Sequence, residues 1–330
     1  MTTALDVAGI GNALVDVIAS ADDAFLVTHG LAKGSMALVD AAGAERLYRA
    51  MGPAVEVSGG SAANTMAGLA SLGSRSAFIG RVADDQLGEV FAHDLRAAGV
   101  AFDPPAVGPG GSPTGRSLIV VTPDAQRTMS TLLGAASELG PEDVDDEVVA
   151  AAEITYLEGY LFDRPAAREA FEKAAALSHG AGRRVAVSLS DSFCVERYRS
   201  EFLSLLESGA DILFANQDEL CLLGGTDDPD AALTGVERYC PLVVMTRGAA
   251  GSTVVADGQR HDVEAVAVAH VVDTTGAGDL YAAGFLHGLV AGLDPATCGR
   301  LGAMAAAEVI SHVGARPETP LAALAASLLG

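Results

Sequence analysis

Short apolar runs alternate with amphipathic stretches along most of this chain. The apolar runs have the length of buried strands, and the amphipathic stretches between them have the length and spacing of helices. This alternation is typical of a doubly wound, mostly parallel α/β sheet, whose right-handed crossovers place helices on both faces. The expected strands are Leu5–Ala8, Ser76–Gly80, Ile154–Gly159, Arg184–Ser190, Asp211–Ala215 and Pro241–Thr246, and two expected helices are Pro165–His179 and Glu196–Ser208.

Two regions break this alternation. In each of them, short extended segments follow one another with turn signals between them and without a long helix. We therefore expect one α/β domain over residues 1–330, in which segments of about 12–57 and 100–122 form a small β-sheet lid over the main strands. The expected short strands are Gly9–Ala19, Met36–Val39 and Val55–Val57 in the first region, and Val100–Ala106 and Ser117–Thr122 in the second.

Composition and charge narrow the class of protein. Half of the 330 residues are apolar, as in a well-buried globular enzyme, and 20 basic residues face 43 acidic ones. A net charge of −23 argues against nucleic acid or an anionic membrane as a partner, although backbone amides can still make a small site locally positive. No apolar run reaches the ~18 residues of a membrane-spanning helix, and no basic residue precedes Lys33 as a signal peptide requires. We expect a soluble, cytoplasmic protein whose four cysteines are reduced and mostly buried.

The string from Asp273 to Asp279, Asp-Thr-Thr-Gly-Ala-Gly-Asp, carries the clearest chemistry. It lies between an expected strand, Val263–Val272, and an expected apolar helix, Leu280–Val290. Glycines at a helix N-terminus let an anion approach unpaired N–H groups. Asp279 could accept a hydroxyl proton there, although an acidic first-turn residue also simply stabilises the helix dipole. Amide donors beside a base are the protein parts that phosphoryl transfer to an alcohol needs.

Three other strings each have a functional and a purely structural interpretation. Ser58–Asn64 is either a turn with a serine helix cap or a site where amides and Asn64 hold substrate hydroxyls. Thr246–Gly251 either binds nucleotide phosphate or turns the chain between adjacent strands. Asn216 and Glu219, three residues apart, either position magnesium-bound water or begin a helix.

Other phosphate-binding designs are excluded by the sequence. The chain has two lysines, Lys33 and Lys173, and no GxxxxGK[ST] string, so a P-loop is absent. The lysine and catalytic loop of protein kinases are absent too. Gly9-Ile-Gly11 resembles a dinucleotide fingerprint but lacks its third glycine. Backbone amides and a few arginines must therefore hold any ATP phosphates.

Taken together, these strings resemble the ribokinase-type (PfkB-type) carbohydrate and nucleoside kinases over nearly the full length. Gly59-Gly60 matches the family's first signature and Asp273–Asp279 its second, while Asn216–Glu219 and Thr246–Gly251 match its NxxE and TxGxxG motifs. The resemblance implies a Rossmann-like main domain, a β-sheet lid, MgATP as phosphoryl donor and a hydroxymethyl group as acceptor. Some members need a monovalent cation beside the second signature, which makes K+ a further candidate cofactor.

The resemblance also implies a role for each matching residue. Asp279 would be the general base, the amides of the glycine-rich turn before it would form the anion hole, and Arg127 would be a neighbour of the transferred phosphoryl group. For catalysis the residues are Asp279, Gly276, Ala277, Gly278 and Arg127; for ATP they are Asn216, Thr246, Gly248, Gly251, Thr275, Gly276 and Gly278; and for magnesium, through water, Asn216 and Glu219.

Within the family, several stretches are most similar to adenosine kinases. Gly11–Asp16 resembles their GNPLLD segment, and Arg127–Ala136 their RSL-to-AAA stretch. Tyr156–Phe162 and Leu189–Phe193 match segments that supply apolar or aromatic faces to the base. The implied substrate contacts are Asn12, Asp16, Gly59, Gly60, Ser61, Asn64, Met129, Leu161, Phe193 and Asp279.

The sequence therefore predicts a kinase for the 5′-hydroxyl of adenosine that gives AMP and ADP. The alternative is a kinase for a free sugar such as ribose or fructose. Two departures bear on this choice, because Leu161 replaces an aromatic residue and Ala303 replaces a polar neighbour of the ATP adenine. The free edge of the lid allows a monomer or a homodimer.

Overall fold

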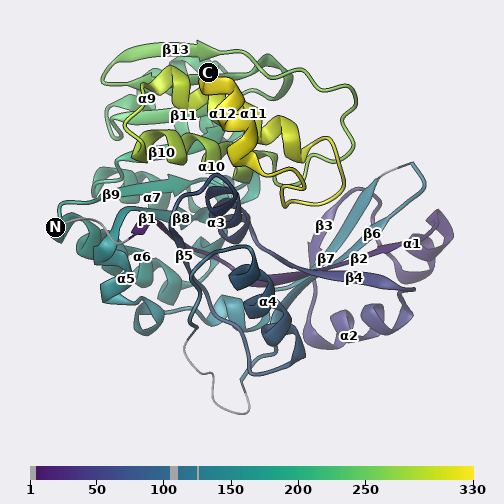
Figure 1. Cartoon of the computed structure of the whole chain (residues 1–330). Helices are drawn as coiled ribbons and strands as arrows, with labels where there is room; N and C mark the ends of the chain where they lie inside the picture. The colour runs from purple at the N-terminus through teal and green to yellow at the C-terminus, as the bar shows by residue number, and fades with distance from the viewer. Residues whose placement is uncertain (1–4, 105–110, 125) are drawn as a thin grey trace.

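The computed structural model describes residues 5–104, 111–124 and 126–330, and its main sheet has eight strands (Figure 1). All neighbouring strands from β11 to β5 are parallel, while β12 and β13 are antiparallel additions. The predicted doubly wound, mostly parallel α/β sheet is confirmed. In spatial order its strands are β13 (Gln259–Val263), β12 (Ser252–Ala256), β11 (Leu242–Thr246), β10 (Ile212–Asn216), β9 (Arg184–Ser188), β8 (Ala152–Glu158), β1 (Leu5–Ile10) and β5 (Ser76–Ile79).

Helices cover both faces of this sheet because its strands are apolar on both sides. Val185 and Val187 of β9 pack into one core and Ala186 into the other, as the two-residue period of a strand requires. The first core is covered mainly by α3 (Ser61–Ser71), α4 (Gln86–Ala97), α10 (Ala277–Val290) and α11 (Pro295–Val309), and α12 (Leu321–Leu329) packs beside α11. The second is covered by α5 (Asp146–Ala151), α6 (Pro165–Gly180), α7 (Ser192–Glu207), α8 (Gln217–Gly224) and α9 (Pro229–Glu237).

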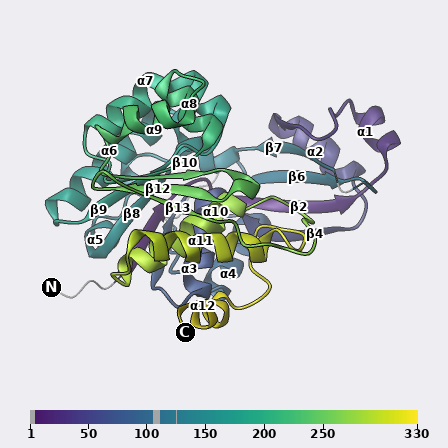
Figure 2. The same ribbon diagram turned by 90° about the horizontal axis from the view of Figure 1, so that it is seen from above.

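A second, smaller sheet projects to one side of the main body (Figures 1 and 2). Arg116 on its central strand contacts Glu45 and the Tyr48 ring of α2, so a helix covers this face of the sheet. In spatial order the strands are β3 (Met36–Leu38), β7 (Arg127–Leu132), β6 (Gly115–Val121), β2 (Leu14–Ser20) and β4 (Ala54–Gly59), with helices α1 (Asp23–His29) and α2 (Ala41–Ala50) between them in sequence. The remaining helical turns are 3-10 turns at Gly134–Glu138, Pro141–Asp143, Gly159–Asp163 and Gly248–Ala250.

The sequence-based boundaries of the second sheet need correction. Arg127–Leu132 belongs to it, beyond the predicted end of the lid at residue 122. Ala101 instead lies beside the main sheet, where its backbone exchanges hydrogen bonds with Ser76 and Phe78 of β5. The rest of the predicted segment Val100–Ala106 lies partly outside the described residues. Helices α1 and α2 also interrupt a region that we predicted to be mostly extended.

The predicted strand Val263–Val272 is wrong. Strand β13 ends at Val263, and the chain from Glu264 to Val272 is irregular and mostly exposed. The ladder ends there because Val263 pairs with Ser252, the first residue of β12. Beyond Ser252 the chain turns into β11, so nothing remains for residues 264–272 to pair with, whatever their β propensity.

Other sequence-based predictions agree with the structure. No helix among residues 5–104, 111–124 and 126–330 is both long and apolar enough to cross a membrane. The four cysteines are free, and all except Cys221 are buried.

Candidate active site

The Asp279 carboxylate lies in the first turn of α10 and is held by the first turn of α3. Its Oδ1 accepts a hydrogen bond from Ser61 Oγ at 2.6 Å, and its Oδ2 accepts one from Asn64 Nδ2 at 2.9 Å. Ser61 is therefore not the helix cap of our structural interpretation. The cap residue of α3 is Gly60, which makes no side-chain capping bond. The three predicted residues meet although 218 and 215 positions separate them in sequence.

The glycine-rich turn before Asp279 presents the start of α10 as predicted. Gly276 is the cap residue, with a φ of 79° that favours glycine, and a Cβ there would lie 2.8 Å from that of Ala315. The first backbone bond of the helix runs from Leu280 N to Gly276 O, so the amides of Gly278 and Asp279 precede it. A Cβ on Gly278 would meet nothing within 4 Å, which leaves its surface open to a ligand.

One of the three amides that we predicted to form the anion hole is already hydrogen-bonded within the protein. The Ala277 amide donates a hydrogen bond to the carbonyl oxygen of Thr274 at 3.2 Å, within the turn itself. The remaining predicted amides, those of Gly276 and Gly278, flank it at the positive end of the helix dipole.

Asp273, at the start of the turn, anchors Arg127 of β7. The Asp273 Oδ2 lies 2.7 Å from Arg127 Nη2, and Arg127 Nη1 donates to Thr275 Oγ1 at 3.3 Å. The other contacts of the carboxylate come from the Thr275 amide, the Thr275 hydroxyl and the Gly314 amide, at 2.8 to 3.0 Å. These contacts fill its acceptor positions, so a monovalent cation at this turn would depend on backbone carbonyl oxygens instead.

Glu158, at the end of β8, fixes the predicted substrate residue Asn12. Its Oε1 accepts from the Asn12 side-chain amide at 2.8 Å, and its Oε2 accepts from the Ala62 backbone amide at 2.8 Å. Because Asn12 Nδ2 is used in this way, Asn12 presents its Oδ1 as the free side of the amide. Asn12 lies just after β1 and Glu158 ends the adjacent parallel strand β8, and the carboxyl ends of these two strands meet at one edge of the sheet.

Gly59 and Gly60 allow the close packing of β2, β4 and α3. Gly60 has a φ of 92°, and a Cβ on it would lie 2.1 Å from the carbonyl oxygen of Asn12. A Cβ on Gly59 would lie 2.5 Å from Cγ of Asp16. The predicted residues Asn12, Asp16, Gly59 and Gly60 thus lie together beside Ser61, between the main body and the second sheet.

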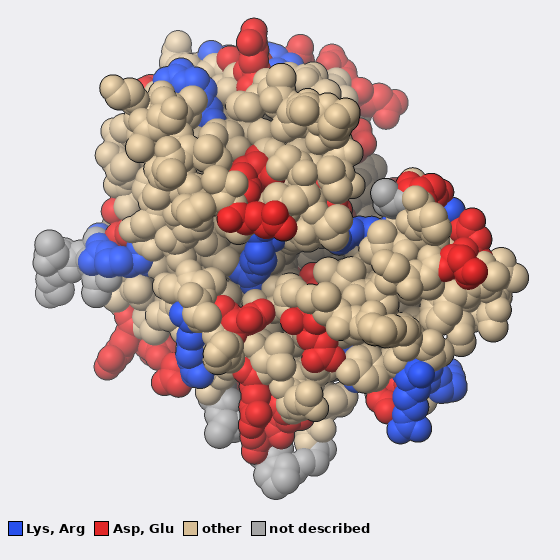
Figure 3. All heavy atoms as spheres, turned by 45° about the vertical axis from the view of Figure 1, so that its right-hand side comes forward, with Lys and Arg blue, Asp and Glu red and all other residues tan. Residues whose placement is uncertain are grey.

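A hollow in the molecular surface coincides with this junction. Figure 3 shows it between the main body and the second sheet, with acidic and basic side chains at its border. Burial raises the pKa of Asp279, which its hydrogen bonds to Ser61 and Asn64 and the charge of Arg316 oppose. Burial likewise raises the pKa of Asp16 to about 6 and that of Glu158 to about 7. A raised pKa suits a carboxylate that takes a proton near neutral pH.

The face of the second sheet that carries Asp16 has a polar row and an apolar row; Ser117 and Thr131, which share a hydrogen bond, lie in the row of Asp16. Side chains alternate along a strand, so Ile18 shares this face with Asp16. The register places Ile119 of β6 beside Ile18, Met129 of β7 beside Ile119, and Met36 of β3 beside Met129. Met36 is 45% exposed, Met129 is half-buried and Ile119 is buried, so the predicted residue Met129 lies in an apolar row that is accessible at its Met36 end.

The two other apolar residues that we predicted to contact the substrate, Leu161 and Phe193, differ from each other in exposure. Leu161 is 2% exposed and packs in the core between the main sheet and helices α5–α9, so it belongs to the core rather than to the wall of the site. The position of Leu161 in this core thus accounts for a leucine where the family resemblance predicts an aromatic residue. Phe193, at the start of α7, is 72% exposed and its ring is available to a ligand.

Asn216 and Glu219 form a reciprocal capping box at the start of α8. Asn216 Oδ1 accepts from the Glu219 amide at 2.8 Å, and Glu219 accepts from the Asn216 amide and side chain at 2.9 and 2.6 Å. This geometry matches the structural interpretation of the pair. Each Glu219 oxygen already accepts one hydrogen bond and keeps a second acceptor position, so the pair fits the predicted contact with magnesium-bound water. Across the described ranges no group of three or more His, Cys, Asp or Glu could hold a metal.

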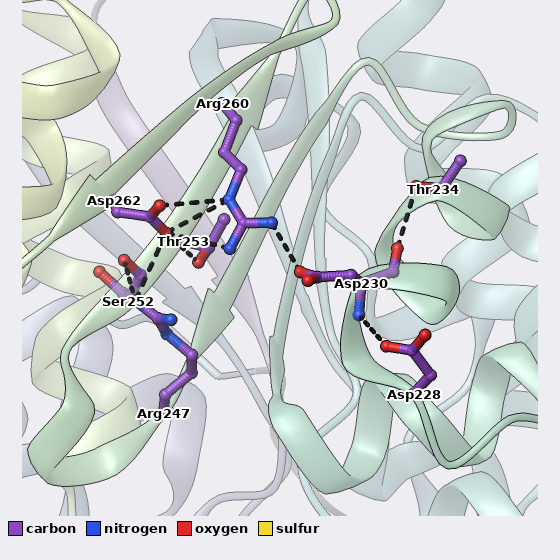
Figure 4. Close-up of polar contacts among 8 residues, drawn as sticks. All are labelled: Asp228, Asp230, Thr234, Arg247, Ser252, Thr253, Arg260 and Asp262. Carbon is purple, nitrogen blue, oxygen red and sulfur yellow. Dashed lines mark hydrogen bonds and ion pairs between the residues drawn. The ribbon is translucent and has the colours of Figure 1, made fainter.

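Thr246–Gly251 makes the hairpin turn between antiparallel strands β11 and β12. Arg247 closes it, because its amide donates to Gly251 O at 2.8 Å and its guanidinium to Ser252 O at 3.3 Å (Figure 4). Gly248 and Gly251 have positive φ values of 56° and 84°, and a Cβ on Gly251 would lie 2.0 Å from Val263 O. The string therefore forms a turn, and its contact with the nucleotide stays a prediction. Thr246 lies beside Asn216 in the sheet register, which brings the two predicted nucleotide strings together.

The sequence-based predictions missed three residues that organise the site. Glu158 and Asp273 carried a usable signal, since each is an acidic residue within a string already singled out. Arg316 carried none, because it lies in an irregular segment after α11. Its guanidinium donates to the carbonyl oxygens of Ser58 and Ala63 at 3.1 and 2.7 Å.

Comparisons with known proteins agree with this geometry. Residues 38–322 match the pfkB family carbohydrate kinase domain. An adenosine kinase structure from Sinorhizobium meliloti is 54% identical, with a TM-score of 0.91, over 98% of this chain and 99% of that one. A probable sugar kinase structure from Rhizobium etli is 48% identical, with a TM-score of 0.92, over 99% of both chains.

Relatives found by sequence act on other substrates by name. The 2-dehydro-3-deoxygluconokinase of Thermoproteus tenax is 31% identical over 274 residues, which cover 79% of this chain and 82% of the relative. The 5-dehydro-2-deoxygluconokinase of Shouchella clausii is 28% identical over 261 residues, covering 77% and 80%. Kinases of this family use ATP, generally with Mg²⁺. The four sequence strings, the fold and these matches establish that the chain belongs to the PfkB family and is a kinase.

Proposed function

We propose that this chain transfers the γ-phosphoryl group of ATP to the 5′-hydroxyl of adenosine, giving AMP and ADP. The observation that carries the proposal is the Asp279 carboxylate, which Ser61 and Asn64 hold at the open N-terminus of α10. A base and a cluster of amide donors thus lie within one helical turn. In-line transfer to an alcohol needs both of them.

In the proposed reaction Asp279 takes the proton of the substrate hydroxyl. The hydroxyl oxygen then bonds to the γ-phosphorus, the bond from that phosphorus to the β-γ bridging oxygen breaks, and ADP leaves. The leading amides of α10 and the Arg127 guanidinium stabilise negative charge as it develops. Bound magnesium would neutralise phosphate charge, with Asn216 and Glu219 contacting its water. Closure of the second sheet as a lid would exclude water from the reaction.

Adenosine is favoured by the shape of the acceptor side. Asp16 and the free Oδ1 of Asn12 offer acceptors to ribose hydroxyls, next to the apolar row that includes Ile18 and Met129. A purine has a flat apolar face to place against such a row, whereas a bare sugar needs mainly hydrogen-bonding partners. The 54% identical protein from Sinorhizobium meliloti, an adenosine kinase by name, supports the same choice.

A free-sugar kinase is the second candidate. It is favoured by the relatives that are named 5-dehydro-2-deoxygluconokinase and 2-dehydro-3-deoxygluconokinase, and by the position of Leu161, which removes one predicted apolar residue from the site. Such an enzyme would use the same base and amides and would differ only in what the second sheet contacts.

An assay of ADP release distinguishes the two candidates. It compares adenosine, inosine, ribose, fructose and 2-dehydro-3-deoxygluconate as acceptors, each with MgATP and with an acceptor-free control for ATP hydrolysis. We expect adenosine to have the highest kcat/KM and AMP to appear in equal amount to ADP. A higher kcat/KM for any of the three sugar-type acceptors would replace the proposal with the second candidate.

A further inference from the structure

The tripeptide Gly314–Arg316, after α11, touches both signature strings of the site. The Gly314 amide donates to Asp273 Oδ2 at 2.8 Å. Ala315 packs on Gly276 so closely that a Cβ there would lie 2.9 Å from the Ala315 Cα. Arg316 then reaches the turn between β4 and α3. One short segment therefore joins the turn that carries the base to the turn that positions it.

Arg316 holds both ends of the Ser58–Ala63 turn. Its Nε and Nη2 donate to the Ser58 carbonyl oxygen at 3.2 and 3.1 Å, and Nη2 also donates to Ser58 Oγ at 3.0 Å. Its Nη1 donates to the Ala63 carbonyl oxygen at 2.7 Å. On the other side of the turn, Asp94 of α4 accepts from the Ser58 amide at 2.9 Å. The planar guanidinium fork suits this use, since it fixes several acceptors in one geometry.

The turn held in this way contains the residues that place the general base. Gly60, the cap residue of α3, lies in this turn and has a positive φ, and the Ser61 hydroxyl donates directly to Asp279. Displacement of the Ser58 carbonyl oxygen would therefore move Ser61 relative to Asp279. Displacements of about 1 Å at a reacting centre are enough to reduce turnover by about 100-fold.

Arg316 also brings a positive charge into a region of acidic groups. That charge lowers the pKa of both Asp279 and Asp16, against the larger effect of burial. Burial lowers the pKa of Arg316 itself to about 10, so it stays charged at neutral pH. The charged and titratable groups around Asp279 are Arg316 from the segment after α11, Asp16 from β2, Tyr156 and Glu158 from β8, and Tyr160 from the following 3-10 turn.

We propose that Arg316 is a positioning residue for phosphoryl transfer, which holds the Ser58–Ala63 turn against the Asp273–Asp279 turn. It contacts no reacting atom and acts through Ser61 and Asp279. The inference rests on the proposed kinase mechanism and is independent of which acceptor is used. The positive charge of Arg316 also acts on Asp279, because loss of this charge makes Asp279 harder to ionise. A purely structural role would not have this effect.

The test compares Arg316→Met and Arg316→Lys with a matched control, Arg75→Met. Arg75 makes an exposed ion pair with Asp6 away from these turns. The readouts are kcat and KM as functions of pH, with the best acceptor of the native protein, and hydrogen–deuterium exchange of peptides that cover Ser58–Ala63 and Asp273–Asp279.

We expect Arg316→Met to lower kcat by about 10- to 100-fold and to move the acid limb of the kcat profile up by about 0.5–1 pH unit. Exchange should rise in both turns. Arg316→Lys keeps the charge but not the fork, so its acid limb should stay in place while kcat falls less. Arg75→Met should match the native protein. An unmoved acid limb in Arg316→Met, or exchange in both turns equal to native, would overturn the inference.

The outcome remains distinct from that of the proposed function. If the native protein prefers a sugar, adenosine fails as the acceptor while Arg316 is tested unchanged on the sugar. If the native protein phosphorylates none of the acceptors, the proposed function fails, and unchanged exchange of the two turns in Arg316→Met would by itself reject the positioning role.

Discussion

The site has an acceptor half, around Ser61 and Asp279, and a donor half, around Asn216 and Arg247. The two halves are held together by different kinds of contact. In the acceptor half, Ser61 meets Asp279 across 218 positions of sequence and Asn12 meets Glu158 across 146. In the donor half, the Asn216–Glu219 capping box spans three positions, and a hairpin turn beside it is closed by its own Arg247. The acceptor half is thus a product of the whole fold, and the donor half is largely a product of local sequence.

This difference has an energetic consequence. Local hydrogen bonds form with a helix end or a hairpin and need little else, whereas long-range contacts exist only when the main sheet and the second sheet are both in place. We therefore expect changes in the acceptor half to affect catalysis and global stability together. Changes in the donor half should have smaller and separable effects.

The largest expected effect comes from removing the base. Asp279→Asn keeps the size of the side chain and removes its charge, so kcat should fall by about 10²- to 10⁴-fold while acceptor binding persists. Steady-state kinetics and titration calorimetry measure the two quantities. Glu89→Gln, which changes an exposed first-turn carboxylate of α4, is the matched control and should leave kcat unchanged. Turnover near the native value in Asp279→Asn would contradict the proposed role.

A pair of glycine substitutions separates folding from ligand contact. Gly60→Ala places a Cβ 2.1 Å from the Asn12 carbonyl oxygen at a φ of 92°, so the free energy of unfolding should fall by about 2–5 kcal/mol in urea denaturation. Gly278→Ala meets no protein atom within 4 Å, so its stability should match that of Gly235→Ala, an equally open helical position. Only Gly278→Ala should raise the KM for ATP. Equal loss of stability in Gly60→Ala and Gly278→Ala would refute this separation.

Two buried glutamates, Glu158 in the acceptor half and Glu219 in the donor half, provide a pH test of the comparison. Burial raises the pKa of Glu158 and of Glu219 from 4.5 to about 7 in the folded protein. Between these values the native state binds more protons than the unfolded chain, so stability falls as pH rises from about 4.5 to about 7. In the variants Glu158→Gln and Glu219→Gln, the free energy of unfolding should fall over this pH range by about 2–3 kcal/mol less than in the native protein.

Urea denaturation at several pH values measures these slopes, and kinetics assigns each residue to its half of the site. Glu158→Gln should raise the KM of the acceptor, because Asn12 loses its partner, and Glu219→Gln should raise that of ATP. The opposite assignment, or a slope unchanged from native in either variant, would contradict the expected division.

The smallest expected effect lies on the exposed face of the donor half. Arg260 of β13 bridges Asp230 of α9 and Asp262 at 2.6 and 3.3 Å (Figure 4). Exposed ion pairs contribute about 0.2–1 kcal/mol, so Arg260→Ala should lower the melting temperature only slightly and leave kcat unchanged. A loss of activity would show that this hairpin is coupled to the chemistry more tightly than its local contacts indicate.

The same division explains how much could be predicted from the sequence. The alternation of apolar runs gave the sheet and both helix layers, since periodicity is a local property. The motif strings placed Asn216 and Thr246 at the carboxyl ends of strands and Asp279 at the start of a helix, where the structure has them. The family resemblance of these strings also predicted that Ser61, Asn64 and Asp279 belong to one site.

What the sequence could not give depended on partners far away in the chain. Residues 264–272 have the composition of a strand but no neighbouring strand to pair with. Leu161 lies in a string that matches a base-binding segment, yet its side chain packs in the hydrophobic core. Arg316 belongs to no pattern, and only the fold brings its guanidinium to Ser58.

The contact of Arg316 with Ser58 also bears on the order of synthesis. These residues are 258 positions apart, so a growing chain has made β4, α3 and the whole second sheet long before the partner of Ser58 is translated. All four family strings precede Arg316 as well. A product of a prematurely terminated message could thus match every family motif and still lack the clamp between its two signature turns. For this chain, intact motifs in a shortened gene do not by themselves indicate a competent kinase.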